Sequence, residues 1–155
     1  MSDAYERPIS SLSPHIFVSN AAAAIDFYKK AFNAEELTRH LAPDGKRIMH
    51  AALLLNGTTL MLCDDFPEYC GGKSSTPEAL GGSPVVLHLQ VKAADPVFER
   101  AVAAGATVRM PLADQFWGDR YGQITDPFGH TWSIGSQVKK LTEEQIREAS
   151  KAAFQ

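Results

Sequence analysis

The sequence predicts an α+β fold of two βαβββ modules, followed by a C-terminal helix. Two observations lead to this prediction. The stretch H-I-F-V at 15–18 returns as H-L-Q-V at 88–91, and each copy belongs to a segment with period-two hydrophobicity. After each copy the same signals follow in the same order, a helical pattern and then three short strands. The chain is therefore expected to contain an internal duplication.

Composition and turn signals divide the chain into five parts. The first residues are polar and are expected to form a loose arm, whereas the middle segment contains prolines and paired glycines without periodicity, which is typical of a linker. Near the end, Thr142 precedes Gln145 by the spacing of a capping box, which starts a helix. The expected parts are an N-terminal arm (1–11), a first module (12–64), a linker (65–82), a second module (83–137) and a C-terminal helix (138–155).

The first module is expected to begin with a strand near Leu12 that carries His15 and Phe17 on a mixed face. Asn20 then offers an N-cap for the helix A-A-A-A-I-D-F-Y-K-K-A-F, and Asn33 is expected to end that helix. Three strands follow, separated by the turns P-D-G-K and N-G. They are expected at 35–42, 47–55 and 58–64.

The second module opens with the strand S-P-V-V-L-H-L-Q-V, which has two unlike faces. Val86, His88 and Gln90 form a mixed face, and the alternate residues form an apolar stripe that a helix should cover: Val85, Leu87, Leu89 and Val91. A helix is expected to open at Ala94 or Asp95 and to end at Gly105. Its predicted inward positions are Val97, Phe98, Ala101 and Val102, and the remaining strands are expected at 107–112, 121–125 and 130–137.

Charge and composition exclude several classes of partner. The 155 residues include 15 basic and 18 acidic side chains, interspersed, with a formal net charge of -3 at pH 7. No run of lysine and arginine is present, so neither nucleic acid nor a membrane surface is an expected partner. The N-terminus lacks the apolar core of a signal peptide and no stretch approaches the length of a membrane span, so a cytoplasmic location is expected. Cys63 and Cys70 are then expected to be free thiols.

Three segments together carry a resemblance to a known family: A-I-D-F-Y-K-K-A-F in the first helix, F-W-G-D-R-Y-G at 116–122 and D-P-F-G-H-T-W at 126–132. With the duplicated βαβββ order, they resemble the vicinal oxygen chelate superfamily, in its glyoxalase, bleomycin-resistance and PhnB-like branch. The resemblance covers 12–137. It implies that the two modules form curled mixed sheets around a cavity, each sheet making a half-barrel, usually in homodimers. It also implies either a divalent-metal enzyme, such as glyoxalase I or an extradiol dioxygenase, or a metal-free binder of drugs.

The resemblance places the metal ligands of the enzymes at four strand positions, which here are Ser13, Met61, Val86 and Ser133. None of these side chains is a carboxylate or an imidazole, so the usual site is expected to be absent and no cofactor is expected. Moving every position by two residues gives an alternative set, His15, Cys63 and His88, with Gly135 as an open position. That set has the chemistry to hold zinc, nickel, manganese or iron in a lyase, isomerase or dioxygenase.

His15 and His88 allow three interpretations. They can be neutral imidazoles satisfied by each other, by Ser13 or by water. They can be the metal ligands of the alternative set. They can also donate to a bound small molecule, whose affinity would then depend on pH. His50 is a weaker candidate because the sequence does not fix its face, and His40 and His130 lie near turns and are expected to be solvated.

The loop W-G-D-R resembles the W-G-x-R segment beside the cleft of bleomycin-resistance proteins. Trp117 offers a flat apolar surface with one N–H, and Arg120 supplies a planar cation for an anionic or carbonyl-rich ligand. In the alternative interpretation, Phe116 and Trp117 plug the end of a barrel. Arg120 would then pair with Asp119 or Asp126.

The predicted function is binding of a small molecule in the sheet cavity of a homodimer. The expected ligand-binding residues are His15, Phe17, Met61, His88, Trp117 and Arg120, and an apolar floor suits a planar or hydrophobic ligand. The metal-dependent enzyme is the alternative, and a purely structural protein would need its cavity filled by Phe17, Met61, Phe116 and Trp117. No catalytic residue is predicted. Cys63 lies beside two acidic residues, which disfavours a thiolate nucleophile, and no hydrolase, redox or nucleotide motif is present.

Overall fold

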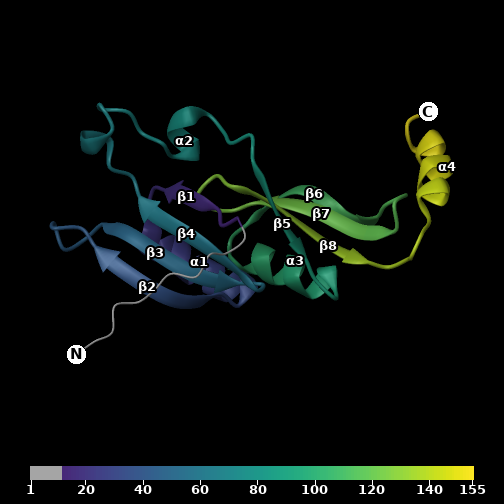
Figure 1. Ribbon diagram of the computed structural model, residues 1–155, viewed down its shortest axis with the longest axis horizontal. Coiled ribbons are helices and arrows are strands. Elements are labelled where there is room, and N and C mark those ends of the chain that lie inside the picture. Colours follow the sequence, from purple (N-terminus) through teal and green to yellow (C-terminus); the bar gives the residue numbers. More distant parts are fainter. Residues whose placement is uncertain (1–11) are drawn as a thin grey trace.

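The computed structural model describes residues 12–155, so the expected arm at 1–11 lies outside the described residues. The chain folds as two βαβββ modules with a linker between them and a helix after them (Figure 1). The first module consists of β1 (His15–Val18), α1 (Ala21–Phe32), β2 (Glu35–Leu41), β3 (Ile48–Leu55) and β4 (Thr58–Asp64). The linker contains η1 (Pro67–Tyr69) and α2 (Pro77–Leu80). The second module consists of β5 (Val86–Gln90), α3 (Ala94–Ala104), β6 (Thr107–Asp114), β7 (Asp119–Thr125) and β8 (Thr131–Gln137), and α4 (Glu143–Ala153) follows.

Each module forms a four-stranded mixed sheet that does not close. The first sheet has the order β1-β4-β3-β2, and the second has the order β5-β8-β7-β6. The first and last strands of each module run parallel, with His15 beside Met61 in one sheet and His88 beside Ser133 in the other. The other neighbours are antiparallel. The duplication and the α+β fold class predicted from the sequence are therefore confirmed.

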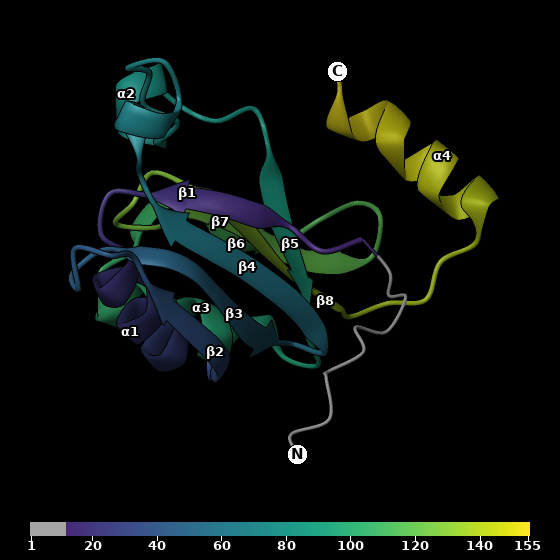
Figure 2. The ribbon, with the colours of Figure 1, turned by 60° about the vertical axis from the view of Figure 1, so that its left-hand side comes forward.

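One face of each sheet is covered by a helix. The opposite face, called the open face below, is not covered by a helix of residues 12–155. Ile16 and Leu62 of the first sheet and Leu89 and Ile134 of the second are buried in one continuous apolar core with the helices. The helices α1 and α3 lie on the same side of the molecule and pack against each other (Figure 2). The predicted alternation of apolar and mixed faces thus decides which side of each sheet the helix covers.

A buried polar residue at the end of the last strand of each module holds the start of that module's helix. The carboxylate of Asp64 accepts a hydrogen bond of 2.8 Å from Ala21 N and one of 2.6 Å from Ile48 N. In the second module the hydroxyl of Ser136 has the equivalent place and accepts from Ala94 N at 3.2 Å. Because the first N–H groups of a helix have no partner inside it, these side chains fix the position of each helix on its sheet.

The predicted helix ends are present. Asn20 caps α1 by accepting from Ala23 N at 3.1 Å, and Asn33 ends it in the left-handed conformation with φ of 55°. Thr142 and Gln145 form the predicted capping box of α4. This helix has no buried residue and lies at the far end of the molecule (Figure 1).

Several details differ from the sequence prediction. The linker contains two single-turn helices, because Pro67 and Pro77 each start one. Val102 of α3, predicted to face inward, is 37% exposed, and Val85 precedes β5 and is 57% exposed. The strand β6 extends to Asp114 although it includes Pro111, which is tolerated because β6 is an edge strand with irregular pairing.

Among residues 12–155, no helix is long and apolar enough to cross a bilayer.

Candidate functional site

His88 lies on the open face of the second sheet, as its strand parity predicts. Its Nε2 is 2.8 Å from Gln90 Oε1, and its Nδ1 is 2.7 Å from the hydroxyl of Ser133. An amide oxygen only accepts, so Nε2 donates to Gln90, while Nδ1 shares its hydrogen bond with a hydroxyl that can donate or accept. Both ring nitrogens are engaged. The ring therefore has no free nitrogen to offer to a metal ion.

Three rings form a continuous row on this open face, called the ring row below. The rings of His88 and Tyr121 are stacked with centroids 6.0 Å apart, and those of Tyr121 and Trp117 meet edge to face at 5.6 Å. Gly135 lies beneath the row, and a Cβ there would lie only 3.1 Å from His88 Cε1. Glycine at this position therefore leaves the space in which the imidazole lies flat. The ring row offers an aromatic surface of the kind that binds planar ligands.

Polar groups border the ring row, and sequence reasoning missed most of them. Gln123 Nε2 donates to the phenol oxygen of Tyr121 at 2.9 Å. Arg109 of β6 donates from Nη1 to Thr131 Oγ1 at 3.0 Å. The parity of β7 places Gln123 on the same face as Tyr121, so strand alternation would have found it. No local signal indicates that Arg109 reaches as far as β8.

Arg120 does not belong to this surface. It lies on β7 one residue before Tyr121 and therefore faces the side of the sheet that carries α3. Its Nε and Nη2 bind the carboxylate of Asp95 at 2.6 Å and 2.9 Å, and its Nη1 lies 3.2 Å from Asp114. The hydrogen bonds from Arg120 lower the pKa of Asp95. The guanidinium is paired, as the alternative interpretation expects, but with Asp95 and Asp114 instead of Asp119 or Asp126.

The open face of the first sheet carries the other predicted residues. The rings of His15 and Phe17 stack at 5.6 Å, and His15 meets His50 edge to face at 6.0 Å. Met61 is the register partner of His15, and Cys63 is that of Phe17. His50 therefore lies on the open face, and His40 stacks on it at 6.3 Å from the edge strand. This cluster contains three imidazoles, where the sequence had placed only His15 on the mixed face.

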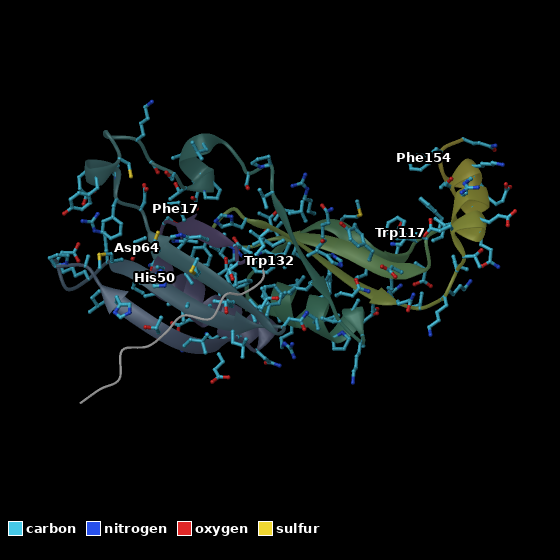
Figure 3. The ribbon with its side chains drawn as sticks, in the orientation of Figure 1. Phe17, His50, Asp64, Trp117, Trp132 and Phe154 are labelled. Atoms are coloured by element: carbon cyan, nitrogen blue, oxygen red, sulfur yellow. The ribbon has the colours of Figure 1, made fainter. Side chains whose placement is uncertain are left out.

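The structure does not bring the predicted residues of the two modules together within one chain. Phe17 and His50 lie near one end of the molecule, Trp117 lies near the other, and Trp132 lies between them (Figure 3). Trp132 is only 2% exposed and packs against Tyr28 and Phe32 of α1, as its strand parity predicts. The predicted site is therefore two open faces, one on each sheet.

The ligand set of the metal enzymes does not fit the residues present. Ser13, Met61, Val86 and Ser133 offer no imidazole or carboxylate. The alternative set is divided between two sheets, and within residues 12–155 no group of three or more His, Cys, Asp or Glu side chains is arranged to hold a metal ion. Burial, with the charges of Asp64 and Asp65 adding to it, raises the pKa of the Cys63 thiol to about 11, which disfavours the thiolate that a metal needs.

Two further predictions concern the four side chains that could fill a common cavity and the solvation of His130. Phe17 and Met61 lie on the first sheet and Phe116 contacts Trp117 at the far end of the second, so these four side chains do not fill one common cavity. A small cavity of about 130 Å³ lies instead between the modules, with Leu55, Asn56 and His88 among its lining residues. His130, expected to be solvated, donates from Nε2 to the carbonyl of Phe17 at 2.8 Å and so links the modules.

The comparison with known proteins agrees with this architecture. The chain is 57% identical over 139 residues to the uncharacterized protein Mb0911c of Mycobacterium bovis, covering 90% of this chain and 91% of that protein. The crystal structure of TioX from Micromonospora sp. ML1 is similar, with a TM-score of 0.64 and 28% identity over 83% of this chain and 98% of that one. The fosfomycin resistance protein FosX of Listeria monocytogenes shares the fold, with a TM-score of 0.63 and 17% identity over 90% of this chain and 99% of that one.

A family model matches most of the chain as well. It is described as "Glyoxalase/Bleomycin resistance protein/Dioxygenase superfamily" and covers residues 9–134, a span that includes the first module and the second as far as Ile134 in β8. The duplicated modules, the open mixed sheets and this match agree with one another. The chain belongs to the glyoxalase/bleomycin resistance protein/dioxygenase superfamily.

Proposed function

We propose that this protein binds a planar aromatic or hydrophobic small molecule on the open face of its second sheet, in the cytoplasm and without the metal site of its enzymatic relatives. The observation that carries this proposal is the ring row of His88, Tyr121 and Trp117. It gives a ligand an aromatic wall with a polar border. Within the superfamily, such a role suits the metal-free binders of the PhnB-like and bleomycin-resistance branch better than the metal enzymes.

The state of His88 supports binding over metal catalysis. Its two hydrogen bonds, to Gln90 and Ser133, fix the plane of the imidazole and occupy both nitrogens. Ser133 is only 2% exposed, so breaking its bond to His88 would leave a buried hydroxyl without that partner. A ring fixed in this way stacks on a ligand without losing further conformational freedom.

We further propose that a second copy of this chain covers the open faces in a homodimer. Each open face carries exposed apolar residues, with Leu54 of the first sheet 38% exposed and Val86 of the second 42% exposed. The two sheets have the same topology, so two copies can pair a first sheet with a second sheet in two equivalent contacts. This pairing would also bring His15, Phe17 and Met61 of one copy opposite the ring row of the other. Sedimentation velocity tests it, and a monomer at micromolar concentration would contradict it.

The binding proposal is tested by fluorescence titration with 2-naphthamide, a neutral planar probe, followed by thermal unfolding with and without that probe. A ligand that binds the native state raises Tm. Trp117→Ala should weaken binding about tenfold or more, because an aromatic wall is removed. Tyr69→Ala is the matched control, since Tyr69 is 78% exposed in the linker and distant in sequence from the ring row. Equal affinities of Trp117→Ala and the parent protein would contradict the proposal.

A further inference from the structure

The side chain of Arg109 reaches a strand that is not adjacent to its own. It belongs to β6, the edge strand of the second sheet, yet its Nη1 bonds Thr131 Oγ1 on β8. Because β7 lies between β6 and β8, the side chain of Arg109 crosses the sheet over β7. Thr131 pairs in register with Val86 and Thr125, and it alternates with Ser133 and Gly135 along β8. Alternate residues of a strand share a face, so the guanidinium lies on the open face that carries the ring row.

No ion pair within residues 12–155 neutralises the charge of Arg109. Arg39, Arg47 and Arg120 each lie within 2.8 Å of a carboxylate oxygen. Across the described part of the chain, by contrast, no carboxylate is within ion-pair distance of Arg109, whose one side-chain hydrogen bond goes to Thr131. A guanidinium carries five N–H donors in a planar fork that matches the oxygens of a carboxylate or a phosphate. Most of these donors remain available to a ligand.

The position of Arg109 relative to the ring row defines the size of a ligand. Along β8, Thr131 lies two residues, or ~7 Å, from Ser133, which is the register partner of His88. It lies four residues from Gly135, which is the register partner of Tyr121. A ligand with one or two fused rings on His88 and Tyr121 would therefore extend an attached acidic group to Arg109. The hydroxyl of Thr131 would lie beside that group.

We propose that the ligand of this open face is a planar aromatic acid, whose carboxylate or phosphate binds Arg109 while its rings stack on the ring row. This inference rests on the proposed function and specifies the chemical class of its ligand. The cation that the sequence analysis assigned to Arg120 is supplied by Arg109 instead. Recognition by a permanent charge distinguishes acids from neutral aromatics of the same shape.

The test uses three probes that differ only in the substituent: 2-naphthoate, 2-naphthyl phosphate and the neutral 2-naphthamide. Each is titrated by calorimetry into the full-length protein, its Arg109→Gln variant and its Arg147→Gln variant. Arg147→Gln is the matched control because it removes the same charge from an exposed position on α4. A charge-assisted hydrogen bond contributes roughly tenfold or more in affinity. At least one acid should therefore bind the parent protein and Arg147→Gln about tenfold more tightly than the amide does.

In Arg109→Gln the acid should lose about tenfold in affinity, while the amide binds as before. Arg109→Lys keeps the charge without the planar fork, so its affinity for the acid should lie between the affinities of the parent protein and of Arg109→Gln. It replaces Arg109→Gln in the test if the glutamine variant does not fold. Equal affinity of acids and amide for the parent protein, or an equal loss for acid and amide in Arg109→Gln, would overturn the inference and leave the binding function intact. Failure of all three probes to bind would overturn the proposed function and this inference together.

Discussion

The phenol of Tyr28 donates a hydrogen bond of 2.6 Å to the buried carboxylate of Asp126, which joins the helix of the first module to the β7–β8 turn of the second. Asp126 also accepts from Trp132 Nε1 at 2.9 Å and from the backbone N–H groups of Phe128 and His130 at 2.9 Å and 3.0 Å. One carboxylate therefore holds the turn, a core indole and the helix α1. Burial, with the charge of Asp126 adding to it, raises the pKa of Tyr28, so the phenol stays a donor at neutral pH.

Removing this phenol should lower stability. Tyr28→Phe keeps the ring in the core but takes one of four donors from a buried carboxylate, so we expect the free energy of unfolding to fall by about 1–3 kcal/mol. Urea denaturation followed by circular dichroism measures the change. Tyr69→Phe is the control, because Tyr69 is exposed in the linker and its change should stay within about 0.5 kcal/mol. A Tyr28→Phe protein as stable as the control would show that the link is energetically unimportant.

Gly118 should not tolerate alanine. Its φ is 98°, and a Cβ there would lie 2.5 Å from the carbonyl oxygen of Lys139, which leads into α4. The carbonyl of Gly118 also accepts from Val138 N and Lys139 N. Gly118→Ala should therefore destabilise the protein by about 1–3 kcal/mol. Gly71 also has a positive φ, but a Cβ there would have no atom within 4 Å. Gly71→Ala therefore introduces the backbone strain without the clash, and it should lower the free energy of unfolding by less. Equal losses in the two variants would exclude the contact with Lys139 as the cause.

The two cysteines should differ in reactivity. Burial and the neighbouring Asp64 and Asp65 raise the pKa of Cys63 to about 11, whereas Cys70 is exposed. A raised thiol pKa leaves only about one thiolate in a thousand at pH 8, and this fraction grows as the pH rises. Iodoacetamide at pH 8 should therefore label Cys70 first, and peptide mass spectrometry can follow both sites. Equal labelling of Cys63 under native conditions would contradict the buried environment, and labelling in urea gives the reference.

Loss of the His88 ring should weaken ligand binding. His88→Ala removes a stacking surface and leaves Ser133 without its partner, so we expect an affinity loss of about tenfold for 2-naphthamide, measured by calorimetry. Tyr69→Ala is again the control, because Tyr69 is 78% exposed in the linker, away from both open faces. An unchanged affinity in His88→Ala would remove this residue from the site.

Chelation should leave binding unchanged. Because the residues at the metal positions of the family do not fit a divalent ion, protein purified without a chelator or an affinity tag should contain well below one metal ion per chain. We expect dialysis against EDTA to change neither Tm nor the affinity for 2-naphthamide. Plasma emission spectroscopy provides the measurement. A stoichiometric zinc, nickel, manganese or iron content would support the metal-dependent enzyme instead, with His15, Cys63 and His88 combined across two chains.

Local rules made much of the architecture predictable. Asn20 and Asn33 bound α1 as capping chemistry requires. Period-two alternation correctly placed His88 and Gln90 on the face opposite Leu87 and Leu89, because neighbouring residues of a strand always point to opposite sides. The same rule, applied to β7, separates Arg120 from Tyr121. The sequence prediction missed this because it started the strand at Tyr121 and left Arg120 in the loop.

The sequence by itself determined the duplication, the order of elements in each module and the faces of the first strand of each module, since all of these follow from residue type and spacing. Only the tertiary structure decided how the modules meet. It placed His15 and His88 on separate open faces and paired Arg120 with Asp95 across the gap between sheet and helix. It also carried Arg109 over a neighbouring strand to Thr131. Contacts made by long side chains between distant segments depend on the packing of whole elements, and no local pattern encodes that packing.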